Sequence, residues 1–336
     1  MFDKLPLATL RRQVRRTWLP AVSLAAALLA PWSAQAQSSG GDRALRVVVP
    51  WNAGGGTDAV TRAIAAALAG PLQMPVIVEN KPGANGMIGM EQVARAKADG
   101  WVVGVASVET HAVNPHVYKK VPYRPLQDFT PVGMMAEFPY ALVTRPTLEA
   151  KDLGAFLAAA RAKPGAMTFA SWGVGSSSQI AFELLKQTAK VDLLHVPFTG
   201  AAPALQAVIA GQVDAVMVPL SIAEPQWRGG KARLLGLGSA QRAAITPDLP
   251  TLGEQGVPVV GGTWLAMVGP AGMPRDQVER INKALNVALA TPELRAALDK
   301  LGVQARSGTP AELGKLLETE LGRWGEVVRT ANVRVD

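Results

Sequence analysis

The chain has 336 residues, of which 49 % are hydrophobic and 18 % are charged, with three histidines and no cysteine. This length and apolar content exclude a disordered chain and allow two lobes with cores of their own. The lack of cysteine excludes disulfides, thiolate metal sites and cysteine nucleophiles, and three histidines argue against a histidine-rich metal site. We therefore expect neither a metal nor a cofactor.

Residues 1–36 have the pattern of an export signal. Lys4 and four arginines (Arg11, Arg12, Arg15 and Arg16) come first, an apolar run over 19–30 follows, and Ala34-Gln35-Ala36 offers the small residues that a signal peptidase accepts. The apolar run is too short for a comfortable transmembrane helix. We expect cleavage after about Ala36, through either the general or the twin-arginine pathway, and a soluble periplasmic product. A retained amphipathic anchor is the alternative.

The formal net charge of +8 depends strongly on this segment. Five of its residues are basic and Asp3 is acidic, so its removal lowers the net charge to +4. A mild and dispersed charge of this kind does not support a nucleic-acid partner.

Strand-like and helix-like segments alternate along the rest of the chain. Short β-branched runs predict strands at 45–49, 76–78, 101–106, 141–144, 168–171, 193–196, 214–218, 234–237 and 264–268. Amphipathic spacing predicts helices from Thr57 or Asp58 onward and at 87–97, 151–163, 176–189, 202–210, 274–290 and 310–330. Residues 114–131 are expected to form a proline-rich connection. The alternation predicts an α/β fold with mostly parallel sheets, as one barrel or as two lobes.

Two glycine-rich turns favour two lobes. Residues 53–58 read AGGGTD and residues 171–178 read SWGVGSSS, each after the first strand of a strand–helix series. Such turns line the crevice at the carboxyl ends of parallel strands, so two facing lobes would place both on one ligand. Glycines allow positive φ and close approach of the backbone, and helix N-termini attract anions. The alternative is a capped turn that binds nothing. Neither turn matches a phosphate-binding or dinucleotide-binding motif.

Residues 80–86 and 197–203 supply two further strand-to-helix turns, but acid–base groups are scarce. His195 lies in a strand-like run, and His111 and His116 flank an Asn-Pro pair at a spacing that does not suit metal binding. An exported hydrolase using Ser171 or Ser176 would need His195 as its base. Capture of a ligand is the favoured interpretation.

Taken in order, these motifs resemble the extracytoplasmic solute-binding proteins of tripartite tricarboxylate transporters, the Bug family. The resemblance rests on PWNAGGGTD at 50–58, VENKPGANG at 78–86, DFTPV at 128–132, the turn at 171–178, HVPFTG at 195–200 and GQVD at 211–214. It implies a type II periplasmic-binding-protein fold with a ligand cleft between two α/β lobes. One lobe would comprise 45–140 with 258–336, and the other 141–257.

The resemblance also implies which residues bind the ligand. First-lobe contacts would come from Ala53, Gly54, Gly55, Asn80, Gly83, Ala84 and Gly86. Second-lobe contacts would come from Ser171, Gly173, Gly175, Ser176, Ser177, Thr199 and Asp214. The chain departs from the family at Phe198, where tyrosine is frequent, and at Thr199, where lysine is common, and Trp172 places a large aromatic side chain at the cleft edge. The implied ligand is a small carboxylate, either a di- or tricarboxylate or an aromatic or other organic acid. The chain, expected to be a monomer and not an enzyme, would pass it to the permease subunits of a tripartite transporter, or signal to a sensor kinase.

Overall fold

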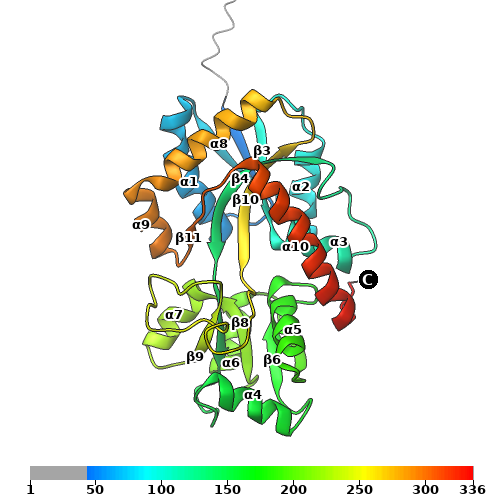
Figure 1. Ribbon diagram of the computed structural model, residues 1–336, viewed down its shortest axis with the longest axis vertical. Helices are drawn as coiled ribbons and strands as arrows, with labels where there is room; N and C mark the ends of the chain where they lie inside the picture. Colours follow the sequence, from blue (N-terminus) through cyan, green and yellow to red (C-terminus); the bar gives the residue numbers. More distant parts are fainter. Residues whose placement is uncertain (1–43, 336) are drawn as a thin grey trace, which may run out of the picture. The chain divides into compact units, whose positions relative to one another are not determined.

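The computed structural model describes residues 44–335, and the expected signal segment with its cleavage site lies outside this range. Within it, two β-sheets flanked by helices form an α/β fold (Figure 1). No helix in residues 44–335 combines the length and the apolar content that a membrane span needs.

The first sheet has six strands in the order β11-β4-β10-β3-β1-β2. In chain order these are β1 (Leu45–Val49), β2 (Val76–Asn80), β3 (Val102–Ser107), β4 (Phe129–Phe138), β10 (Thr263–Pro270) and β11 (Gln304–Ala305). The second sheet has the order β7-β6-β8-β5-β9. Its strands are β5 (Tyr140–Thr144), β6 (Thr168–Ser171), β7 (Leu194–Pro197), β8 (Ala215–Pro219) and β9 (Arg233–Gly238).

The expectation of mostly parallel sheets is corrected to mixed sheets. Strand β1 pairs in parallel with β2 and β3, and β6 does so with β7 and β8. Strand β10 runs antiparallel to β3 and β4, and β5 runs antiparallel to β8 and β9. These antiparallel strands are the ones next to the connections between the sheets, where the chain leaves one sheet and later returns (Figure 1).

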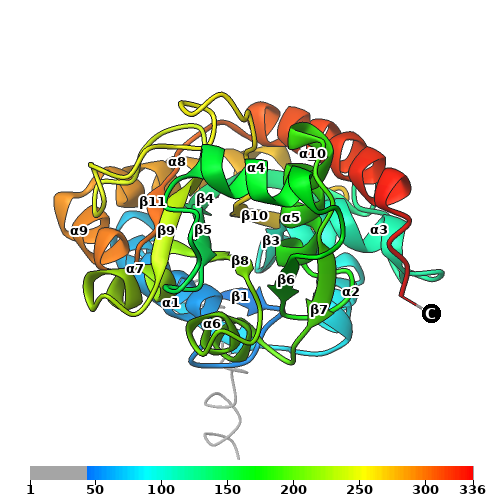
Figure 2. The same ribbon diagram turned by 90° about the horizontal axis from the view of Figure 1, so that it is seen from below.

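Helices cover both faces of each sheet. Apolar side chains of α1 (Gly56–Leu72), α8 (Arg275–Ala290) and α9 (Pro292–Lys300) pack on one face of the first sheet, and those of α2 (Met87–Ala94) and α10 (Pro310–Ala331) on the other. The second sheet is covered by α4 (Leu153–Ala162) and α5 (Ser177–Ala189) on one face and by α6 (Ala201–Ile209) and α7 (Leu220–Arg228) on the other (Figure 2).

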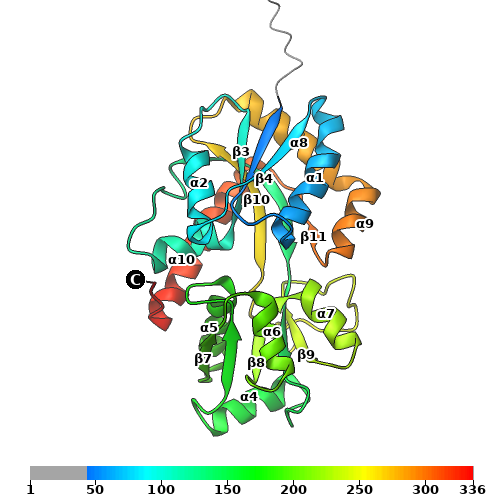
Figure 3. The same cartoon turned by 180° about the vertical axis from the view of Figure 1, so that it is seen from behind.

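Two segments of the chain join the sheets. Strand β4 ends at Phe138, and β5 starts after one intervening residue, Pro139. The chain returns after β9 through residues 239–262 and enters the first sheet as β10. Figure 3 shows β10 descending toward the second sheet, where β8 and β9 lie. We call the segment Phe138–Tyr140 the crossing strand. Its two aromatic side chains are buried in a cluster that extends through both sheets.

Candidate functional site

The first glycine-rich turn lies between β1 and α1 and is held by side chains behind it. The Gly54 N–H donates to Asp58 Oδ2 over 2.8 Å, and Asn80 Nδ2 donates to Asp58 Oδ1 and to the Trp51 carbonyl. Arg62 Nε pairs with the same carboxylate at 3.0 Å. Asn80, expected as a ligand contact, therefore fixes the shape of the turn. Of the glycines here, Gly54 requires a positive φ, of 82°, whereas Gly55 has an ordinary φ of −77°.

The Asp58 carboxyl is charged although it is buried. Burial raises its pKa, but hydrogen bonds from Arg62, the Gly54 amide and Asn80 together lower the pKa by more than burial raises it. The net shift is therefore downward. The acid is engaged in the turn itself. It therefore stabilises the turn, and the first backbone N–H groups of α1 have no partner within the helix.

The loop at residues 83–86, between β2 and α2, has an unusual backbone. Four consecutive residues have positive φ: Gly83 at 129°, Ala84 at 46°, Asn85 at 51° and Gly86 at 84°. Two of them carry side chains, which makes this a strained segment. Asn85 and Asn114 exchange hydrogen bonds of 2.8 and 2.9 Å, and these bonds hold the loop in place. Backbone strain of this kind is common at functional sites.

A π-helical turn, η2 (Glu109–Val113), packs against that loop. A Cβ at position 86 would lie 2.7 Å from Thr110 Cγ2, so the loop backbone and η2 are in close contact. His111 of this turn is completely buried between Phe129 and Tyr123, and burial lowers its pKa to about 3. His111 is therefore a neutral core residue. His116 bonds instead to the Leu321 carbonyl through Nε2, at 2.9 Å.

The second glycine-rich turn lies between β6 and α5. The Ser176 side chain caps α5 by accepting from the Gln179 N–H, and its hydroxyl donates to the Gly173 carbonyl. The Gly175 N–H donates to Gln179 Oε1. Both Gly173 and Gly175 have positive φ, of 131° and 75°. The turn is thus built from glycine conformations and a serine cap, as its sequence indicates.

Ser171 and His195 form a close pair that a hydrolase would need. The Ser171 Oγ lies 2.6 Å from His195 Nε2. However, Ser171 is completely buried, and its hydroxyl is also bonded to the Gly173 carbonyl and amide. Burial, with help from Lys186, lowers the pKa of His195 to about 4, and its ring stacks on Phe169. The geometry therefore fits a support for the turn better than a nucleophile open to a substrate.

The remaining second-lobe residues divide into two groups. Trp172 and Phe198 are half-buried beside the turn, where the Phe198 N–H donates to the Ser171 carbonyl, and Thr199 is exposed next to them. Asp214 lies elsewhere. It precedes β8 and bonds to Thr168 and Arg145, at the amino end of strands whose carboxyl ends carry the turns. The expected contact from Asp214 is therefore not part of this group.

The crossing strand brings the turns of the two lobes together. A Cβ at Gly56, in the first turn, would lie 3.5 Å from the Phe138 ring. Two residues further on, the Tyr140 ring packs edge-on against Trp172 at 5.6 Å, and its hydroxyl lies 2.8 Å from that of Ser177. We call the region between these turns, above residues 138–140, the interlobe site.

Sequence reasoning missed Glu109, which makes a hydrogen bond between the lobes. It belongs to η2, and its Oε1 accepts a hydrogen bond from the Ser177 hydroxyl of α5. Its position just after a buried strand was a usable signal, since side chains there lie at the carboxyl edge of the sheet. That it reaches the other lobe depends on tertiary structure.

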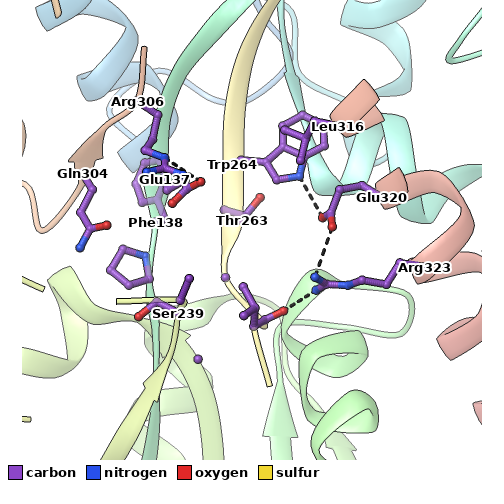
Figure 4. A pocket seen from close by; sticks show the side chains of 15 residues that line it. Glu137, Phe138, Ser239, Thr263, Trp264, Gln304, Arg306, Leu316, Glu320 and Arg323 are labelled. Atoms are coloured by element: carbon purple, nitrogen blue, oxygen red, sulfur yellow. Dashed lines mark hydrogen bonds and ion pairs between the residues drawn. The ribbon is translucent and has the colours of Figure 1, made fainter. Parts of the chain in front are cut away.

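A separate cavity of about 210 Å³ lies beside the crossing strand and contains none of the expected site residues. Figure 4 shows Arg306 beside Glu137 and Arg323 beside Glu320 around it. The N–O distances in these pairs are 3.0 and 3.2 Å. Because each arginine is already paired with a carboxylate, the cavity offers less free positive charge than its two arginines suggest.

A family model and individual relatives of the chain point to the same protein family. The chain matches the tripartite tricarboxylate transporter family receptor over residues 60–333. It is 35 % identical over 290 residues to the UPF0065 protein in the tcbD-tcbE intergenic region of Pseudomonas sp. strain P51, which covers 85 % of each chain. It is 30 % identical over 312 residues to Protein BugT of Bordetella pertussis, covering 92 % of this chain and 95 % of the relative.

Solved structures agree. The Rhodopseudomonas palustris protein MatC with bound malate is 36 % identical, with a TM-score of 0.72 over 85 % of this chain and 99 % of that one. A second R. palustris protein, solved with adipate, is 30 % identical, with a TM-score of 0.76 over 87 % of this chain and 98 % of that one. The chain therefore belongs to the tripartite tricarboxylate transporter receptor family, which includes the Bug proteins, and has the fold of a periplasmic binding protein.

Proposed function

We propose that the chain is a periplasmic solute receptor that captures a small organic carboxylate in the interlobe site and presents it to the permease subunits of a tripartite transporter. The observation that carries the proposal is the meeting of two glycine-rich helix starts at one crossing strand, through Gly56 against Phe138 and Ser177 against Tyr140. Two relatives of similar fold were solved with malate and with adipate, which supports a carboxylate as the ligand class.

In this proposal, backbone N–H groups do most of the binding. The free N–H groups at the starts of α1 and α5 carry the positive ends of the helix dipoles, and such groups hold anions without a basic side chain. Binding residues are proposed at Ala53, Gly54, Gly55, Gly83, Ala84, Gly86, Trp172, Gly173, Gly175, Ser176, Ser177, Phe198 and Thr199. Among them, Gly54, Gly86, Gly173 and Gly175 allow close approach of the backbone, because their own N–H groups are bonded within the turns. Asn80 and Ser171 act behind them, since their hydrogen bonds hold the two turns.

Ligand binding is proposed to favour an arrangement in which the two lobes approach each other. The sheets 45–138 with 263–305 and 140–238 would move as two bodies about the crossing strand, residues 138–140, and the return segment, residues 239–262. A ligand that contacts both turns stabilises the closed arrangement by its extra affinity for it. The closed form is then what a permease would recognise.

Calorimetric titration tests the proposal. The receptor, purified from the periplasm of an expressing cell, is titrated with malate, adipate, citrate and benzoate, and with sulfate as an inorganic anion. We expect one site per chain for at least one carboxylate and no measurable heat for sulfate. If correctly folded protein binds none of a broad set of carboxylates, the proposed function is wrong.

A further inference from the structure

A buried carboxylate already occupies the ligand-facing end of α5. Glu109 Oε1 accepts from the Ser177 hydroxyl, and Glu109 Oε2 lies 3.4 Å from the hydroxyl of Thr263. Ser177 is the first residue of α5, and its hydroxyl also lies 2.8 Å from that of Tyr140. Glu109 is 8 % exposed, Ser177 is 2 % exposed and Tyr140 is 1 % exposed. The first lobe thus contributes a negative charge at the turn of the second lobe.

This carboxylate is held by neutral groups. Its hydrogen-bond partners are hydroxyls, and among residues 44–335 it belongs to no ion pair. A buried charge without a counter-charge is costly unless dipoles and hydrogen bonds stabilise it. The N-terminus of α5 supplies such a dipole, because the carboxylate contacts Ser177, the first residue of that helix. Glu109 therefore occupies the positive end of α5, where an anionic group of a ligand would otherwise bind.

We propose that Glu109 determines the specificity of the interlobe site by excluding a second negative charge from its α5 end. Resting on the proposed function, this assigns the ligand class: an organic acid with one carboxylate, which faces the first-lobe turns at residues 53–56 and 83–86. Its other end, facing Ser177 and Trp172, is uncharged. The half-buried indole of Trp172 suits a neutral polar or aromatic group there, whereas the buried hydroxyls of Ser177 and Tyr140 are bonded to each other and to Glu109.

Electrostatics give the expected size of the effect. Two like charges about 5 Å apart at an effective dielectric constant of about 20 repel by more than the free energy that corresponds to a tenfold change in affinity. A ligand that replaces a distal carboxylate with an amide of the same shape avoids this repulsion. The comparison of a diacid with its half-amide therefore measures the charge of Glu109 with little change in size.

The first test uses the unaltered receptor and two matched pairs, adipate with adipamate and succinate with succinamate, in calorimetric titrations. We expect the half-amide to bind at least about tenfold more tightly than its diacid in the pair that fits the site. Tighter binding of the diacid in both pairs would overturn the inference while leaving the proposed function standing. Absence of binding by every carboxylate would instead overturn the proposed function, and this inference with it.

The second test changes the charge itself. In Glu109→Gln we expect the preference for the half-amide to fall at least about tenfold, since the amide keeps the shape of the side chain and removes its charge. Glu279→Gln is the matched control, because Glu279 is an exposed acid on α8 paired with Arg275. It should keep the preference of the unaltered protein. An unchanged preference in Glu109→Gln would overturn the inference.

A third variant separates charge from hydrogen bonding. Ser177→Ala removes the hydroxyl donor and keeps the Glu109 carboxylate in place, so both members of a pair should bind more weakly by a similar factor and the preference should persist. A loss of preference in Ser177→Ala equal to that in Glu109→Gln would show that the hydroxyl discriminates between the ligands, and the assignment to Glu109 would be wrong.

Discussion

The hydroxyl of Tyr140 lies 2.8 Å from the hydroxyl of Ser177, and this contact joins the crossing strand to the turn of the second lobe. Burial raises the pKa of Tyr140 well above its usual range, and the nearby charge of Glu109 adds to the shift. The phenol therefore stays protonated throughout the physiological pH range and serves as a fixed hydrogen-bonding group.

Removing that hydroxyl should weaken the junction. In Tyr140→Phe we expect the free energy of unfolding to fall by about 1 kcal/mol, because a buried hydrogen bond is lost without loss of ring packing. Carboxylate affinity should fall as well, since Ser177 is then less well positioned. Chemical denaturation and calorimetric titration measure the two effects. An unchanged affinity would show that Tyr140 does not position the second-lobe turn.

Gly86 should be essential for the loop at residues 83–86. Its φ is +84°, and a Cβ there would lie 2.7 Å from Thr110 Cγ2. We expect Gly86→Ala to cost about 1–2 kcal/mol of stability for the left-handed backbone, with a further loss from the contact, and to reduce carboxylate binding strongly. Gly256→Ala is the control, because Gly256 has the same φ and open space around it. Equal ligand affinity in the two variants would contradict this role.

Asp58 should contribute to stability at neutral pH and not at low pH. Its pKa is lowered in the folded protein, so its contribution is present above the pKa of the unfolded chain and is lost as the pH falls through the folded pKa. We expect Asp58→Asn to cost about 1–3 kcal/mol at pH 7, because the carboxylate accepts bonds from Gly54, Arg62 and Asn80. The difference from the unaltered protein should shrink at pH 3. A difference independent of pH would contradict the account.

His195 should make folding sensitive to mild acid. Its folded pKa of about 4 lies below the unfolded value of about 6.5, so the unfolded chain binds the extra proton in this range and stability falls as the pH drops from 6.5 to 4. His111 acts in the same direction. We expect His195→Gln to reduce the slope of unfolding free energy against pH in this range. Equal slopes in the two proteins would show that His195 is not buried as described.

Much of the fold could be predicted from short-range patterns. Strands β1 and β6 begin and end at the residues predicted for them, because both are β-branched or apolar runs bounded by turn residues. Strand β4 (Phe129–Phe138) was missed, since its start fell in the connection expected at 114–131 and no element was predicted over the rest of it. Helices α7 and α9 were missed as well. Pro292 is the first residue of α9, a position that proline suits, whereas Pro225 lies inside α7.

For the candidate site, too, local backbone geometry could be predicted from the sequence, whereas contacts between distant side chains could not. The glycine-rich turns were found because their residue types report local backbone geometry, although the positive φ belongs to Gly54 and not to Gly55. Asp214 was misplaced, because it precedes its strand and so lies at the opposite edge from residues that follow a strand. The position of Glu109 after a buried strand was visible in the sequence, but its contact with Ser177 was not, since Ser177 is 68 positions away on the other lobe.

The location of the bound carboxylate distinguishes the interlobe site from the cavity beside the crossing strand. The receptor is crystallised with the tightest-binding carboxylate from the titrations, and the electron density of the ligand is located. We expect density in the interlobe site, with one carboxylate at the two first-lobe turns, residues 53–56 and 83–86. Density in the cavity beside Arg306 and Arg323, with the interlobe site empty, would contradict it.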